Sequence, residues 1–285
     1  MRLAVLAVFV ATLVAAAAQA SPPPPTQTAG GMSGLVTPKG EARRRGSTPN
    51  LLYHGGPVMR NGAAVTAIFW GSSWSSSDPT VAGLGDFYTG VGGSSYAGTN
   101  TEYTDSTRGT VSSAVSYNGS VVDTSPGPSR APSTSAILAE VAKVITNPVP
   151  NGYYPVYVDA PRGHAGYCAW HSYGTVKGVT VQFAFFFNLT GDPGCDPDSP
   201  VTAYSQNVAA LANVSGHELS EALTDPNLNA WYDSSGAENS DKCAWTFGSS
   251  LLHFGATAWK IQGNWSNAAY DANHGYVRGC IDGTN

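Results

Sequence analysis

A short stretch in the last third of the chain carries the residue types and spacing of a helical metal site. Within residues 216–226, His217 and Glu221 are four positions apart, and Glu218 follows the histidine directly. Residues at i and i+4 lie on the same face of an α-helix, so His217 and Glu221 can converge on one ion while Glu218 points beside it. The pattern is a variant of the zinc-binding motif H-E-x-x-H, in which the glutamate is the general base. It therefore predicts His217 and Glu221 as metal ligands and Glu218 as the catalytic base.

The third ligand must come from another part of the chain, because a catalytic zinc takes three protein ligands and leaves one position open. Asp225 lies about 12 Å from His217 along an intact helix, and it can join only if the helix breaks before it, which Pro226 allows. Otherwise Asp225 caps the turn. Glu238 and Asp241, in the loop that follows, are better placed, and we expect Glu238 to be the third ligand. Further candidates are His164, His171 and His253.

The ligand types bear on which ion is bound. Two carboxylates beside one imidazole cancel the charge of a divalent ion. We expect this ion to be zinc. Calcium is the alternative, because oxygen ligands also bind harder ions. Acidic residues cluster here in a chain with only 12% charged residues, and like charges gathered without a cation are costly. In the competing interpretation, His217 packs on or caps a polar face, and the two glutamates of the motif are ordinary helix-surface residues.

The first 48 residues differ in composition from the rest. Residues 1–20 combine Arg2, an apolar run and an Ala-Gln-Ala site, which is typical of a cleaved secretory signal peptide. Residues 21–48 are rich in Pro, Gly, Ser and Thr, which predicts a disordered linker or propeptide. Arg43, Arg44 and Arg45 are either a processing site or a solvated basic segment. Residues 49–285 are expected to form a single globular domain.

These features predict a secreted monomer, extracellular or in the cell wall, with no membrane span once the signal is removed. Four cysteines suit two disulfides in that compartment, and three pairings are possible. We favour Cys168 with Cys195 and Cys243 with Cys280, because sequence neighbours close the shorter loops. The net charge of -5 and the lack of a basic patch argue against nucleic acid as a partner. Sequons for glycosylation in a eukaryotic cell stand at Asn118, Asn188, Asn213 and Asn264.

Apolar patterning predicts an α+β fold with a mixed sheet. Buried strands are expected at 63–70, 153–158 and 179–187, and a helix at 136–145. Ser199 and Pro200 supply an N-cap and a first-turn proline for a buried motif helix that runs to about Leu223. Residues 231–243 are expected to form a disulfide-anchored loop over the site. Residues 72–129 are left unassigned, and 164–171 are interpreted as an aromatic disulfide loop. The order of elements is similar to that of a zincin-like single domain.

Several segments resemble a known family. The stretches LYHGGPVM (52–59) and AVTAIFWG (64–71) resemble the opening of the EXORDIUM-like, phosphate-induced family of secreted, cell-wall-associated proteins. Residues 166–172, 217–225 and 231–243 are similar to microbial relatives that carry an H-E-x-x-E motif. The resemblance covers about a third of the mature chain and implies a secreted, wall-associated protein. Plant members, which are linked to growth, lack the His-Glu pair, so the growth role does not carry over.

Two functions from different classes follow. The first is a secreted zinc-dependent hydrolase acting on peptide or cell-wall material, with ligands and base supplied by the motif helix. The second is a non-catalytic, wall-associated protein whose acidic cluster holds a structural ion or no metal.

Overall fold

The computed structural model describes residues 29–41, 49–199, 204–255 and 257–284. The expected signal peptide (1–20) and the three arginines at 43–45 lie outside the described residues. Among the helices that are described, none is both long and apolar enough to span a membrane.

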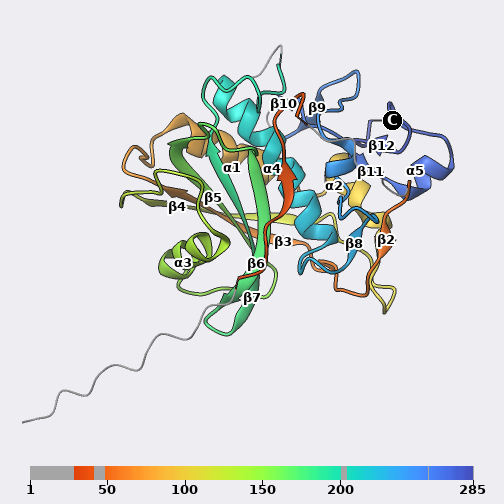
Figure 1. Ribbon diagram of the computed structural model, residues 1–285, viewed down its shortest axis with the longest axis horizontal. Helices are drawn as coiled ribbons and strands as arrows, with labels where there is room; N and C mark the ends of the chain where they lie inside the picture. Colours follow the sequence, from red (N-terminus) through yellow and green to blue (C-terminus); the bar gives the residue numbers. More distant parts are fainter. Residues whose placement is uncertain (1–28, 42–48, 200–203, 256, 285) are drawn as a thin grey trace, which may run out of the picture.

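A six-stranded mixed sheet forms the centre of the fold, with strand order β1-β6-β7-β5-β3-β4 (Figure 1). Four neighbouring strands run parallel, β6 runs antiparallel to β7, and β1 pairs antiparallel with the outer edge of β6. The strands are β1 (Ser33–Val36), β3 (Ala63–Trp70), β4 (Val115–Asp123), β5 (Gly152–Pro161), β6 (Ala169–Val176) and β7 (Val179–Asn188). The α+β class and the mixed sheet are therefore confirmed.

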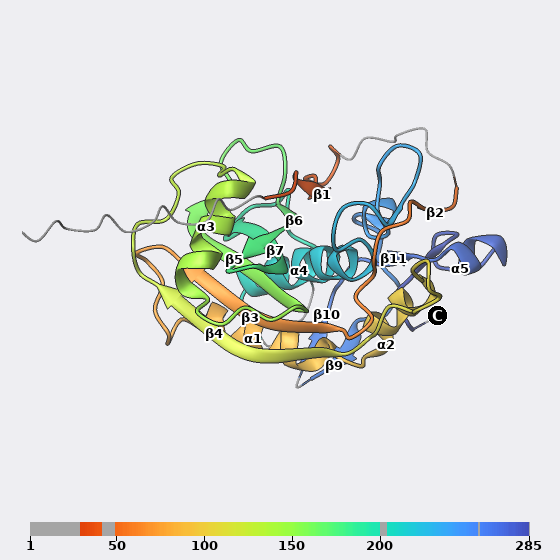
Figure 2. The same cartoon turned by 90° about the horizontal axis from the view of Figure 1, so that it is seen from below.

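Helices cover both faces of this sheet (Figure 2). On one face, the Tyr157 hydroxyl of β5 hydrogen-bonds to Tyr88 of α1 (Pro79–Val91) and to Ser215 of α4 (Gln206–Thr224). On the other face, Gly174 of β6 lies against Leu138 of α3 (Thr134–Val144). Because both faces are buried, the central strands are continuous apolar runs rather than alternating ones.

The helix α4 carries the motif and is buried along its whole length from Asn207 to Thr224. It begins at Gln206, where the Ser205 side chain accepts a hydrogen bond from the Val208 amide. The predicted start at Ser199 and Pro200 is therefore wrong, because a second capping serine stands directly before the helical segment. The end is close to the prediction, since Pro226 cannot continue the helix.

The remaining chain forms short elements on the side of α4 that faces away from β4 (Figure 1). Both predicted disulfides, Cys168–Cys195 and Cys243–Cys280, are present. The paired short strands are β2 (Leu52–Tyr53) with β8 (Trp231–Tyr232), β9 (Leu252–Phe254) with β10 (Thr257–Trp259), and β11 (Asn264–Trp265) with β12 (Cys280–Ile281). The short helices are α2 (Ser95–Gly98), η1 (Thr99–Glu102), η2 (Asp241–Cys243) and α5 (Asn267–Asp271).

Three sequence-based expectations change. The described part of the supposed linker, 29–41, contains β1 and belongs to the sheet, so the domain begins before residue 49. The unassigned segment 72–129 contains α1, α2, η1 and β4. The supposed loop 164–171 runs into β6 at Ala169. The strands β1, β4 and β6 owe their conformation to distant pairing partners, whereas α1 has a local signal in its Asp78 cap, Pro79 and a buried face at helical spacing. Two of the four sequons, those at Asn213 and Asn264, are fully buried.

A buried carboxyl on α3 predicts a pH-dependent stability. Burial and the neighbouring Asp123 carboxylate raise the pKa of Glu140 from 4.5 to about 7, although Lys143 opposes the shift. The folded protein therefore binds more protons than the unfolded chain between pH 4.5 and 7, and this carboxyl lowers stability as pH rises through that window. We expect Glu140→Gln to remove this decline. Melting temperatures measured from pH 4.5 to 7 should fall less in the variant than in wild type.

The exposed carboxylate Glu41 supplies the control, and Glu41→Gln should follow the wild-type curve. Parallel curves for wild type and Glu140→Gln would contradict the assignment.

Candidate metal centre

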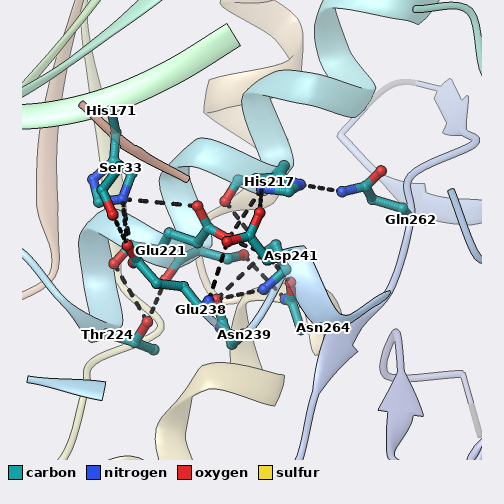
Figure 3. A network of polar contacts seen from close by, with 12 residues as sticks. Ser33, His171, His217, Glu221, Thr224, Glu238, Asn239, Asp241, Gln262 and Asn264 are labelled. Carbon is teal, nitrogen blue, oxygen red and sulfur yellow. Dashed lines mark hydrogen bonds and ion pairs between the residues drawn. The ribbon is translucent and has the colours of Figure 1, made fainter. Parts of the chain in front are cut away.

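One face of α4 brings the predicted motif residues together in a fully buried position. Nε2 of His217 lies 3.0 Å from Oε1 of Glu221, as the four-residue spacing predicts (Figure 3). Glu218 projects beside them and has no exposed surface. His217 and Glu221 therefore lie together as their spacing predicts, while the donor atoms of Glu218 lie close to Glu221 and His171.

The loop after α4 contributes Asp241, at the first residue of η2. Its Oδ1 lies 3.6 Å from Nε2 of His217, and its amide donates a 2.9 Å hydrogen bond to Oε1 of Glu221. Donor atoms of His217, Glu221 and Asp241 all lie within 4.8 Å of one another. Ligands at about 2.0–2.2 Å from a tetrahedral zinc are roughly 3.3–3.6 Å apart, and the distances from His217 to Glu221 (3.0 Å) and to Asp241 (3.6 Å) are close to that spacing.

Glu238, the expected third ligand, lies at the centre but faces a different partner. Its Oε2 is 3.2 Å from Nε2 of His171, and its Oε1 accepts a hydrogen bond from the Ser33 hydroxyl. Among the described residues, two groups of donor atoms are close enough to share one ion. One contains Asp241 and the other contains His171, and Glu238 belongs to neither. The loop 231–243 does reach the site, as expected, and its Asp241, one of the alternatives to Glu238, is the residue that lies in a donor group with His217.

Asp225 caps the turn after α4, which was the alternative to metal binding. Its Oδ1 accepts hydrogen bonds from the amides of Asn229 and Ala230, both at 2.6 Å. The helix ends at Thr224, and Asp225 closes the turn beyond it. It is a capping residue and lies in neither donor group.

His171 is the residue that sequence reasoning ranked too low. It lies on β6 and forms a second donor group with Glu218 and Glu221, with its Nε2 3.7 Å from Oε2 of Glu221. The two donor groups therefore share Glu221, whose two oxygens face different imidazoles. The other two histidines considered as ligands, His164 and His253, are exposed and belong to neither group.

Several polar atoms of this cluster lack hydrogen bonds. Within the described part of the chain, the buried side-chain atoms without a hydrogen-bond partner include Nε2 of His217, both carboxylate oxygens of Glu218, Oε2 of Glu221 and Nδ1 of His171. A buried polar atom without a partner costs about 1–3 kcal/mol, and more when it is charged. His217 Nε2 and Glu221 Oε2 are still paired by charge with a neighbour, whereas both Glu218 oxygens have no such partner, so Glu218 carries the largest cost of burial.

The protonation equilibria reflect this crowding of negative charge. Burial, then the charges of Glu221, Asp241 and Glu238, raise the pKa of Glu218 well above its usual range. Burial and the other carboxylates likewise raise the pKa of Glu221 to about 7, against the attraction of His217. Burial disfavours the charged imidazole of His217, but the Glu221 and Asp241 carboxylates outweigh it and raise the pKa to about 10. Without a metal, protons must neutralise the cluster.

The ring of His217 is held from behind by a side chain of the C-terminal region. The Gln262 amide nitrogen contacts Nδ1 of His217, which directs Nε2 towards Glu221. Gln262 is fixed in turn, because its backbone amide donates to Asn213 and its side-chain oxygen accepts from the Trp245 amide. Such support of a ligand histidine is a regular feature of protein metal sites.

A buried network around Asn264 joins α4 to the loop that carries Asp241. The Asn264 amide donates to the hydroxyls of Ser220 on α4 (3.0 Å) and Thr99 (2.9 Å), and its oxygen accepts from the Ser240 hydroxyl (2.8 Å). These bonds hold Ser240, and therefore the adjacent Asp241, against the helix.

No protein-family model, no curated protein and no solved structure matches this chain. What the centre does must therefore be argued from its geometry.

The Asn264 network yields a test of how the centre is held together. Asn264→Ala removes three buried hydrogen bonds, to Thr99, Ser220 and Ser240, so we expect a loss of about 2–4 kcal/mol in the free energy of unfolding. Urea denaturation measures this loss. Asn118→Ala, at an exposed position on β4, is the control and should stay within about 0.5 kcal/mol of wild type. A loss of that small size for Asn264→Ala would show that the network does not position the loop.

Proposed function

We propose that this chain is a zincin-like, metal-dependent hydrolase. The observation that carries the proposal is the group of donor atoms that α4 and η2 bring within reach of one ion, beside carboxylate oxygens of Glu218 and Glu221 that lack hydrogen bonds. His217, Glu221 and Asp241 are assigned as ligands, and Glu218 as the general base. Two disulfides fit an extracellular protein, and we propose that the enzyme acts outside the cell.

The donor set suits a small divalent cation. It offers one imidazole nitrogen and carboxylate oxygens, a mixture that zinc accepts, whereas calcium takes oxygen ligands in larger number. We therefore propose zinc. When bound, it would act as a Lewis acid that polarises water and the scissile carbonyl group.

Glu218 is the residue assigned to proton transfer. It neighbours the ligands on the same helix, and both of its carboxylate oxygens are free of hydrogen bonds. In hydrolysis of an amide, water adds to the carbonyl carbon and gives one proton to Glu218. Glu218 then passes that proton to the leaving nitrogen as the carbon–nitrogen bond breaks. A base of this kind contributes about 10²–10⁴-fold to the rate.

The competing candidate is a non-catalytic wall-associated protein with a structural ion, as the EXORDIUM-like resemblance implies. The complete burial of His171, His217, Glu218 and Glu221 is the observation in its favour, because structural metal sites are closed. This candidate predicts that chelation lowers the melting temperature while no hydrolytic activity exists to be lost.

Metal content is the first test. We expect the purified protein, produced without a histidine tag, to contain about one equivalent of zinc. His217→Ala should lose it, while His253→Ala, which removes an exposed histidine from β9, should retain it. Elemental analysis by mass spectrometry measures both. Calcium in place of zinc would favour the structural ion, and protein without any metal would refute the assignment.

Glu218→Gln separates binding from catalysis. The amide preserves size but cannot accept the proton, so we expect unchanged zinc content and a fall in kcat of about 10²–10⁴-fold. Turnover is followed with internally quenched peptides. Glu140→Gln, a buried helical glutamate remote from the centre, is the matched control and should keep full activity. A Glu218→Gln variant with wild-type turnover would remove this residue from the mechanism.

A further inference from the structure

The edge strand β1 crosses directly over the candidate centre. It pairs antiparallel with β6, with Ser33 opposite His171 and Val36 opposite Ala169. Backbone hydrogen bonds from the Cys168 amide to the Val36 oxygen (2.6 Å) and from the Gly30 amide to the Tyr173 oxygen (2.8 Å) fix the two ends. β1 therefore lies along the β6 edge that carries His171 and covers the centre from that side.

At the middle of β1, only a glycine fits. A Cβ atom built on Gly34 would lie 1.9 Å from Oε2 of Glu221, 2.7 Å from Cδ2 of His171 and 3.1 Å from Oε2 of Glu218. The backbone of β1 thus touches one complete donor group of the centre. The neighbouring Ser33 hydroxyl donates to Glu238, the remaining carboxylate on that side.

Backbone contacts, rather than side chains, hold most of this segment. Met32 and Leu35 are each 39% exposed, although both are large and apolar. Val36 is fully buried and is the main side-chain anchor. Main-chain pairing with an occasional side-chain pocket is how proteins bind extended peptides at a sheet edge.

We propose that the edge of β6 is a binding groove for an extended polypeptide, which pairs antiparallel with β6 and carries its backbone over Glu218 and Glu221. β1 occupies this groove in cis as the chain's own inhibitor. That β1 inhibits catalysis rests on the proposed hydrolase function, and the substrate class is then a polypeptide. It differs from a reading of β1 as a permanent structural strand, in which no other segment ever takes its place.

The test displaces β1 and offers the groove a free peptide. The probe is a fluorescein-labelled synthetic peptide with the sequence of residues 29–41. Gly34→Val forces β1 off the centre, whereas Gly31→Val is the matched control, because a Cβ at Gly31 meets nothing within 4 Å. Val36→Asp is a second displacing variant that removes the buried anchor without touching the centre. All are made in the full chain, and anisotropy measures binding.

We expect Gly34→Val and Val36→Asp to bind the peptide at least about tenfold more tightly than wild type and Gly31→Val. A tethered segment competes at an effective concentration on the order of millimolar, and the two variants remove that competition. A peptide carrying Gly34→Val itself should not bind, while one carrying Gly31→Val should bind like the parent peptide.

Equal peptide affinity in all four proteins would overturn the proposal. So would the absence of binding in displaced variants that remain folded by circular dichroism. Loss of the folded state in both displacing variants would show that β1 is a structural strand and would also overturn it.

Zinc content and turnover of quenched peptides, measured on the same samples, separate this proposal from the hydrolase assignment. Displaced variants that bind peptide and zinc without turnover would support the groove and refute the hydrolase. A wild-type chain that turns over substrate as fast as Gly34→Val would support the hydrolase and refute occupation by β1.

Discussion

The structure depends on one electrostatic constraint, which is the burial of three glutamates and two histidines around the second half of α4. Glu218, Glu221 and Glu238 have no more than 1% of their surface exposed, in a chain where only 12% of residues are charged. Removing carboxylates from water is expensive unless protons, hydrogen bonds or a cation compensate them. The surrounding elements supply only part of this compensation, so the cluster is costly for the fold and needs a functional explanation.

The two disulfides lie where they brace the walls of this cluster. Cys168 directly precedes β6, three residues before His171, and it is bonded to Cys195. Cys243 ends η2, two residues after Asp241, and it is bonded to Cys280. Each crosslink therefore fixes a segment that carries one of the donor side chains, His171 or Asp241, next to a stretch with little regular secondary structure. The charged side chains are therefore held by these crosslinks as well as by the apolar core that α4 and β6 share.

Much of the fold could be predicted from local pattern. The strand at 63–70 and the core of the strand at 179–187 follow from continuous apolar runs, and both disulfides follow from loop length. The neighbouring positions of His217, Glu218 and Glu221 follow from the helical period alone. The α+β class is confirmed, whereas the zincin-like identity and the family resemblance remain proposals.

The errors share a physical cause. β1 is rich in glycine and serine and has no period of its own, so only the unpaired edge of β6 makes it a strand. His171 was placed in a loop because β6 is buried on both faces and shows no alternation of polar and apolar residues. Asp241 could not be ranked above Glu238, since the choice depends on how η2 docks through Asn264. Long-range pairing leaves little trace in a local window.

The near-complete burial of α4 determines when the centre can form during folding. Asn213, Ser215 and Gly216 in its middle have low helix propensity, and isolated helices of this length are marginal in water, so α4 gains most of its stability from packing. Its partners are drawn from β6 and β7 before it and from Gln262 and Asn264 after it. Such non-local contacts form late in folding. A chain still being synthesised therefore has no assembled centre until the segment that carries Gln262 and Asn264 has been added.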